Sequence, residues 1–163
     1  MKTLLLLRHA KSSWSDPTQS DHDRPLNDRG KRDAPRMGQW IQQQGLVPDV
    51  VLSSTARRAV ETARKVAEHC GFGRAIDTER ELYHAHSEQY RSVLRRIDDQ
   101  HQTALLVAHN PGLEEFLYDL TGASERMPTA ALAQISLDIQ HWSDPLGRQA
   151  GRLIAVWRPK ELQ

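Results

Sequence analysis

The sequence predicts an α/β fold with a mostly parallel central sheet, helices on both faces and an antiparallel hairpin at one edge. Three short apolar runs, at residues 4–7, 50–52 and 104–108, alternate with stretches of helical spacing, which is typical of βαβ units. Unbroken apolar runs indicate strands buried on both faces. The C-terminal segment instead alternates apolar and polar residues, which predicts strands with one face in water.

The first predicted strand, residues 4–7, consists of four leucines and runs directly into Arg8 and His9. These two residues would stand at the carboxyl end of the strand, where open α/β sheets bind ligands. A surface Arg-His pair is the alternative explanation, and this strand alone does not decide between the two. The polar segment 11–24, rich in Ser, Asp and Pro, predicts a loop.

The first predicted helix begins after Asn27, an N-cap residue, and ends at Gly45. Pro35 lies inside this pattern and predicts either a kink or a later start. The apolar positions share one face of the helix: Ala34, Met37, Trp40 and Ile41.

The second predicted strand, residues 50–52, leads into Ser53 and Ser54, which could cap the following helix. That helix has a recurring apolar face and closes at Gly71. A further helix is predicted over roughly 88–97 by apolar spacing.

After the third strand, Asn110 at the cap and Pro111 at the first helical position predict a helix over 113–120. Residues 135–139 then alternate apolar and polar side chains. A turn signal at 144–147 precedes a returning strand at 153–157. This pattern predicts the antiparallel hairpin.

The composition limits the classes of protein to which this chain can belong. With 163 residues, 38% hydrophobic and 26% charged, the chain is expected to form one soluble domain over residues 1–163. A net charge of +1 gives no case for nucleic-acid or membrane binding. One cysteine, Cys70, excludes an internal disulfide, and Arg8 ends the first apolar run too early for a secretory signal. We therefore expect a cytoplasmic location.

Cationic and imidazole side chains follow all three predicted strands. Arg8 and His9 follow the first, Arg57 and Arg58 the second, and His109 the third. Because the carboxyl ends of parallel strands meet at one edge, these groups are expected to converge there. They suit a compact, doubly charged anion, and phosphate fits best because the planar guanidinium matches its oxygens.

Arg57 and Arg58 lie in the first turn of their predicted helix, where the helix dipole disfavours cations. Two solvated arginines would be an adequate explanation. An anion held by the helix N-terminus together with a guanidinium explains the placement better. The helix after Asn110 directs a second set of free N–H groups to the same edge.

The nucleophile is expected to come from this cluster. The sequence has no metal-binding motif, no Ser-His-Asp order and no activated cysteine, so we expect no metal and no cofactor. A neutral histidine can attack phosphorus in line and carry the phosphoryl group transiently. The spacing of His84 and His86 suggests a metal site, but no third ligand lies near them in the sequence.

Several segments resemble one known family. Residues 4–12 resemble the Arg-His-Gly motif region of the histidine phosphatase (phosphoglycerate mutase-like) superfamily, residues 54–62 its second-arginine motif and residues 107–110 its second-histidine motif. The segments 26–30 and 34–38 match the helix after the first loop. The short chain and the Arg-His-Ala variant are most similar to SixA-type phosphohistidine phosphatases.

The resemblance implies a three-layer phosphoglycerate mutase-like fold and a metal-independent phosphatase with a phosphohistidine intermediate on His9. It implies that Arg8, Arg58 and His109 bind the phosphoryl group. Ser15 stands where mutase-like members have the Asn of a Trp-Asn pair. The candidate substrate-binding residues are therefore Arg8, Arg58, His109, Ser15, Arg57 and Asn110.

Glu81 is the candidate proton donor by resemblance, although the glycines that flank the family's glutamate are missing. An imidazole leaving group departs without a strong acid, so an absent donor would favour phosphohistidine. The span between Thr62 and His109 is too short to add a lid, which suits a phosphorylated protein or a small phosphate ester as partner. The alternatives are a sugar- or nucleotide-phosphate phosphatase and a non-catalytic phosphoprotein-binding module. The latter would not need a nucleophile.

Overall fold

A six-stranded sheet with the strand order β3-β2-β4-β1-β5-β6 forms the centre of the computed structural model, which describes residues 1–162. The four strands from β3 to β1 are parallel, and β5 and β6 are antiparallel to their neighbours. This confirms the mostly parallel sheet with an antiparallel edge. The strands are β1 (Lys2–Arg8), β2 (Val50–Ser54), β3 (Asp77–Glu79), β4 (Thr103–Ala108), β5 (Leu132–Leu137) and β6 (Gly151–Trp157).

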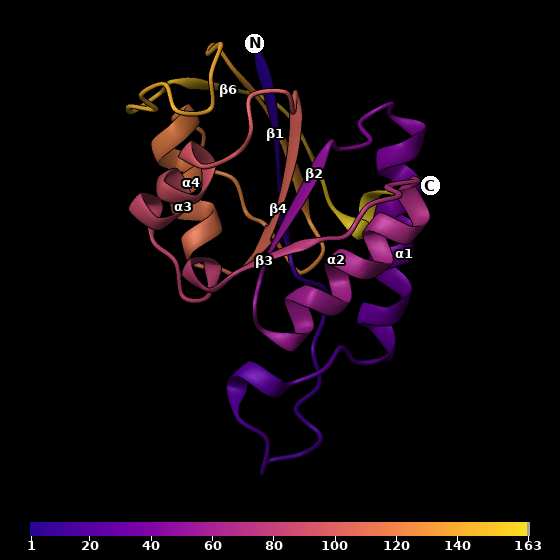
Figure 1. Cartoon of the computed structure of the whole chain (residues 1–163). Helices are drawn as coiled ribbons and strands as arrows, with labels where there is room; N and C mark the ends of the chain where they lie inside the picture. Colours follow the sequence, from indigo (N-terminus) through magenta and orange to yellow (C-terminus); the bar gives the residue numbers. More distant parts are fainter. Residues whose placement is uncertain (163) are drawn as a thin grey trace.

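Helices cover both faces of the sheet, as predicted (Figure 1). α1 (Asp28–Gln43) and α2 (Arg57–Cys70) pack together on one face, and α3 (Ser87–Arg95) and α4 (Gly112–Thr121) pack on the other. Short 3-10 helices lie at η1 (Asp21–Asp23), η2 (Arg80–Leu82) and η3 (Pro159–Glu161). Within residues 1–162, no helix combines the length and the apolar character that a membrane span needs.

The leucine run of β1 divides the interior into two cores. Leu4 and Leu6 pack in the core beneath α3 and α4, whereas Leu5 and Leu7 pack in the core beneath α1 and α2. Side chains alternate between the two faces of a strand, so a run of four leucines serves both cores. All four are fully buried. This packing fixes the end of β1, where Arg8 and His9 stand.

The segment after β1 extends beyond the carboxyl ends of the parallel strands, at the bottom of Figure 1. Its two ends are joined by a β-bridge between Ser12 and Leu26. A Cβ on Gly30 would lie 2.2 Å from the Lys11 carbonyl oxygen, so only glycine lets α1 approach this closely. The base of the loop is thereby held against the sheet edge.

The structure confirms one predicted helix start and corrects two. α1 begins at Asp28, with the predicted N-cap Asn27 accepting from Gly30 N at Oδ1, and it continues through Pro35, so the alternative of a later start is wrong. Ser53 and Ser54 belong to β2 because they pair with β3, and Ala56 takes the N-cap of α2. Pro111 is the N-cap of α4, so Asn110 stands one residue before the cap.

The C-terminal strands form the predicted antiparallel pair, but their connection is more than a turn. Residues 138–150 separate β5 from β6, and Ile139 lies beyond the end of β5. Trp142 in this connection is fully buried and donates from Nε1 to the His101 carbonyl. The connection therefore adds to the core at the end of the molecule opposite the loop after β1.

Candidate active site

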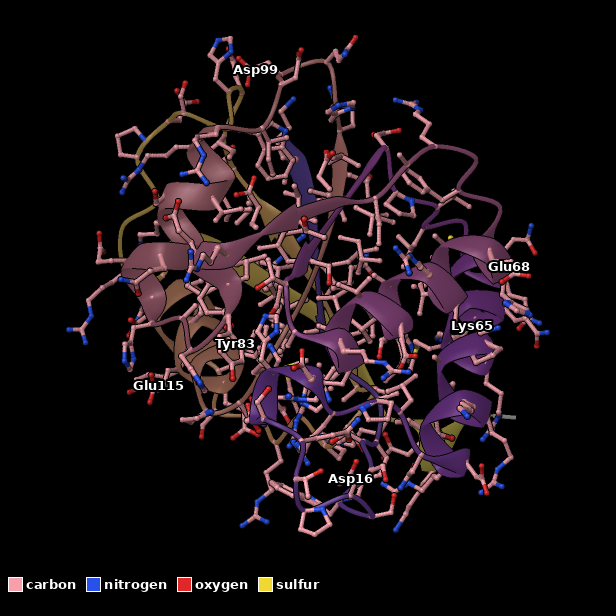
Figure 2. All side chains as sticks on the ribbon, turned by 60° about the horizontal axis from the view of Figure 1, so that its bottom comes forward. Asp16, Lys65, Glu68, Tyr83, Asp99 and Glu115 are labelled. Atoms are coloured by element: carbon pink, nitrogen blue, oxygen red, sulfur yellow. The ribbon has the colours of Figure 1, made fainter. Side chains whose placement is uncertain are left out.

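A pocket of about 410 Å³ lies at the carboxyl ends of β1, β2 and β4. In Figure 2 this edge is turned forward, with Tyr83 beside it and Asp16 on the loop in front. Four cationic side chains and one carboxylate line it, so its electrostatic character is strongly positive. The lining residues are Arg8, His9, Lys11, Ser12, Trp14, Asp21, Arg24, Arg58, His84, His109, Asn110 and Thr129.

The structure places five of the candidate residues in this pocket. Arg8 is the last residue of β1, His9 follows it, and Arg58 is the second residue of α2. His109 and Asn110 directly follow β4. The parallel strands therefore bring these groups together from positions far apart in the sequence.

Three candidates lie outside the pocket lining. Arg57 Nε is 3.5 Å from Glu61 Oε2 on the outer surface of α2, because consecutive helical side chains point about 100° apart. Ser15 is exposed, with its Oγ 2.8 Å from Ser13 Oγ. Glu81 is paired with Arg96 Nη2 at 2.9 Å. The expectation that these residues contact a substrate is therefore not met by their positions.

The His9 ring has a defined tautomer. Its Nδ1 lies 2.8 Å from the Ala10 carbonyl oxygen, which can only accept, so Nδ1 carries the proton and Nε2 keeps a free lone pair. Burial lowers the pKa of His9 to about 3, the Ala10 hydrogen bond opposes this, and the charges of Arg58, Arg8 and Arg24 add to the lowering. The ring is thus neutral, as a nucleophile must be.

His109 lies beside His9, with 5.0 Å between the ring centroids. Its Nε2 is 2.7 Å from Ser54 Oγ; that oxygen accepts from Ala56 N, and its O–H is left to donate to Nε2. With Ser54 as the donor to Nε2, the ring proton stands on Nδ1. Burial, with the nearby His9 and Arg58, lowers the pKa of His109 to about 2. A neutral His109 can therefore donate from Nδ1 to an anion.

Four side chains of the pocket have buried nitrogen atoms with no acceptor within residues 1–162. These atoms are Arg8 Nε, Arg58 Nε, both Nε and Nη1 of Arg24, and His109 Nδ1. Buried N–H groups without an acceptor are unfavourable, so an oxyanion with several oxygens would complete their hydrogen bonding. This donor set fits the tetrahedral phosphate that the sequence predicts.

Asp21 connects the loop to the arginines, and sequence analysis did not identify it. Arg58 donates to its main-chain oxygen at 2.7 Å and to its Oδ2 at 3.0 Å, and the Tyr83 hydroxyl donates to Oδ2 at 2.7 Å. Partial burial favours a higher pKa for Asp21, but these hydrogen bonds and the charges of Arg58 and Arg24 lower it to about 2. The ionised carboxylate holds the Arg58 guanidinium in place.

Arg24 is a second pocket residue that sequence analysis missed. Its side chain is almost fully buried, and Nε lies 3.3 Å from Asp21 Oδ1. Its guanidinium stacks on the exposed ring of Trp14, 3.4 Å from the ring centroid. The loop carries several charged residues, Asp16, Asp21, Asp23 and Arg24 among them, and the sequence does not reveal which of these charges face the sheet.

Three further histidines and the cysteine lie at different places around the pocket and in the core. His22 lies within the loop after β1, and its Nε2 is 2.9 Å from Thr55 Oγ1. His84 lines the pocket, whereas His86 Nδ1 lies 3.6 Å from Glu115 Oε2. Among residues 1–162, no group of three or more His, Cys, Asp or Glu side chains is placed to hold a metal ion. Cys70 is fully buried, and burial raises the pKa of its thiol.

The lowered pKa values of His9 and His109 predict that the folded protein loses stability in acid. An imidazole in the unfolded chain titrates near pH 6.5, whereas in the folded protein the pKa is about 3 for His9 and about 2 for His109. The unfolded chain therefore binds more protons below pH 6.5, and the free energy of unfolding falls as pH decreases. We expect a loss of about 2–5 kcal/mol between pH 7 and 4.5 from these groups.

Urea denaturation at a series of pH values measures this loss. The His109→Gln variant removes one of the two titrating groups and should show a smaller loss over the same range. A stability profile of the unmodified protein that stays level from pH 7 to 4.5 would contradict the neutral, buried state of both rings.

Comparisons with known proteins agree with this geometry. The model of the histidine phosphatase superfamily (branch 1) matches residues 4–86. An uncharacterized protein of Mycobacterium tuberculosis is 34% identical over 149 residues, which cover 85% of this chain and 90% of the relative.

Two solved structures are similar over nearly the whole chain. The putative phosphohistidine phosphatase SixA from Agrobacterium tumefaciens has a TM-score of 0.82 and 30% identity, covering 97% of this chain and 98% of that one. The putative phosphohistidine phosphatase SixA from Nakamurella multipartitia has a TM-score of 0.83 and 26% identity, covering 97% and 96%. The three-layer fold implied by the sequence resemblance is thus confirmed.

Proposed function

This chain belongs to the histidine phosphatase superfamily, and we propose that it is a metal-independent phosphatase that acts on protein phosphohistidine through a covalent intermediate on His9. The observation that carries the proposal is the His9 tautomer. Nδ1–H is bound to the Ala10 carbonyl, so the lone pair of Nε2 is available in a pocket that three arginines line. A neutral nucleophile beside fixed positive charge is what attack on a phosphoryl group requires.

In the first step, His9 Nε2 attacks phosphorus and forms a P–N bond while the bond to the leaving group breaks. Arg8, Arg24 and Arg58 neutralise the charge on the phosphoryl oxygens, and His109 donates from Nδ1 to one of them. Buried and held by Asp21, Arg58 needs little reorganisation as charge develops.

In the second step, water attacks the phosphoryl group on His9. The P–N bond breaks, inorganic phosphate leaves, and His9 returns to its neutral form. The same arginines stabilise this transition state because the same oxygens carry the charge.

Protein phosphohistidine is the substrate class that we propose. Two similar structures, at 30% and 26% identity, carry the name putative phosphohistidine phosphatase. Imidazole is also a better leaving group than a sugar alkoxide, which suits a site in which Glu81 is paired with Arg96 away from the pocket. We further propose that residues 1–163 act as one domain in the cytoplasm.

A substrate panel tests the proposal. We expect a phosphohistidine-containing protein to give a kcat/KM at least about tenfold above that of sugar or nucleotide phosphates, because imidazole leaves without strong acid assistance. Initial rates with excess chelator should equal those without it. Equal or better hydrolysis of sugar phosphates would favour the small-molecule alternative, and binding without turnover would favour a phosphoprotein-binding module.

A further inference from the structure

His84 stands in the pocket with an unusual backbone conformation. It lines the cavity together with both active-site histidines, and its side chain is exposed. Its φ is 58°, in the left-handed region that non-glycine residues seldom adopt. Strained residues of this kind concentrate at functional sites, where neighbouring contacts hold them.

Tyr83 supplies the contact that holds the imidazole of His84. The two rings lie 3.9 Å apart between centroids, at an angle of 38°. The Tyr83 hydroxyl is bound to Asp21, which in turn binds Arg58. Figure 2 shows Tyr83 at the edge of the site, facing the loop after β1. His84 is therefore connected through its neighbour to the phosphate-binding arginines.

The other acid–base groups of the pocket are poorly suited to deliver a proton. His9 and His109 are neutral because burial lowers their pKa to about 3 and about 2. Asp21 is ionised, with its pKa lowered to about 2. Glu81 is paired with Arg96 outside the pocket lining. His84 is the remaining imidazole of the lining, and imidazole is the side chain that most often transfers protons in enzymes.

We propose that His84 is the proton donor of this site, an inference that rests on the proposed phosphatase function. As His9 Nε2 bonds to phosphorus, the bond from phosphorus to the leaving nitrogen or oxygen breaks, and that atom takes a proton from the His84 imidazolium. In the second step neutral His84 takes a proton from the attacking water. Phosphate leaves, and His84 is again protonated.

The groups that face His84 are consistent with this role. The Tyr83 ring packs against the His84 ring at a tilt, and His109, which follows β4, lies near enough for a charge on His84 to lower the pKa of His109. Asp21 from η1 and Arg58 from α2 line the same pocket. A protonated His84 thus adds positive charge beside the phosphoryl oxygens and favours the neutral, donating form of His109.

The His84→Asn variant tests the inference, because asparagine tolerates a positive φ but does not serve as a general acid at neutral pH. The probes are p-nitrophenyl phosphate, phenyl phosphate and an alkyl phosphate. We expect kcat/KM for the alkyl ester to fall by about 10²-fold, the usual size of a general-acid effect. For p-nitrophenyl phosphate we expect a change below about threefold, since its leaving group needs no proton.

The measured quantity is the dependence of kcat/KM on leaving-group pKa, which should be steeper in His84→Asn than in the unmodified protein. His86→Asn is the matched control and should leave all three rates unchanged. An equal loss with every probe, no loss at all, or a leaving-group-dependent loss in Glu81→Gln instead, would overturn the role of His84. The proposed function itself is tested separately, by replacing His9 with alanine: retained turnover in that variant would contradict the function, whereas it would leave the result for His84→Asn unexplained.

Discussion

Replacing His9 with alanine is expected to lower kcat/KM for p-nitrophenyl phosphate by about 10³-fold or more. The substitution removes the Nε2 lone pair that the hydrogen bond from Nδ1 to the Ala10 carbonyl leaves available beside the pocket arginines. Water would then have to attack the substrate directly. Binding should survive better than turnover, because the arginines remain.

Two measurements check this expectation. Initial rates report the loss of turnover, and rapid quenching with ³²P-labelled substrate reports the intermediate, which should be labile in acid and stable in base as a phosphohistidine is. His141→Ala is the matched control, because His141 is exposed and pairs with Asp99 at the opposite end of the molecule (Figure 2). Turnover retained in His9→Ala would exclude the covalent mechanism.

The convergence of Arg8, His9, Arg58 and His109 could be predicted from the sequence because it depends on strands alone. Three apolar runs predict three parallel strands, and the carboxyl ends of parallel strands share an edge. No knowledge of side-chain packing was needed. The register then places Arg8 opposite Ala108, one residue from His109.

The residues contributed by loops could not be predicted in this way. Asp21 and Arg24 reach the pocket because the loop after β1 folds back through the bridge between Ser12 and Leu26. Tyr83 reaches Asp21 across 62 positions of sequence. Loops have no periodic pattern, so only the tertiary contacts determine which of their charges face inward.

Glu81 shows a second limit of sequence reasoning. Its place in the chain resembles that of a family proton donor, but the short segment from η2 to α3 turns the carboxylate toward Arg96. His84 lines the pocket instead, from a backbone position in the left-handed region, which histidine adopts more often than most non-glycine residues do. Position in the chain alone therefore does not show whether a side chain reaches the pocket.

Replacing Arg58 with alanine is expected to lower kcat/KM by about 10³-fold, the range found for arginines that stabilise phosphoryl transfer. Arg58 is 5% exposed and makes two hydrogen bonds to Asp21, and its Nε has no acceptor within residues 1–162. The substitution removes a buried positive charge from the pocket, where we propose that it binds the phosphoryl oxygens. It also removes two of the influences that keep the pKa of Asp21 low.

The neighbouring arginine provides a matched control for this variant. Arg57→Ala removes the same charge from the same helix turn, but Arg57 pairs with Glu61 outside the pocket, so kcat/KM should change by less than about twofold. Arg58→Lys should recover little activity, since an ammonium does not reproduce the planar pair of donors. Added guanidinium should recover part of the Arg58→Ala activity by occupying the cavity. Equal losses in Arg57→Ala and Arg58→Ala would mean that net positive charge, rather than a guanidinium held by Asp21, drives phosphoryl transfer.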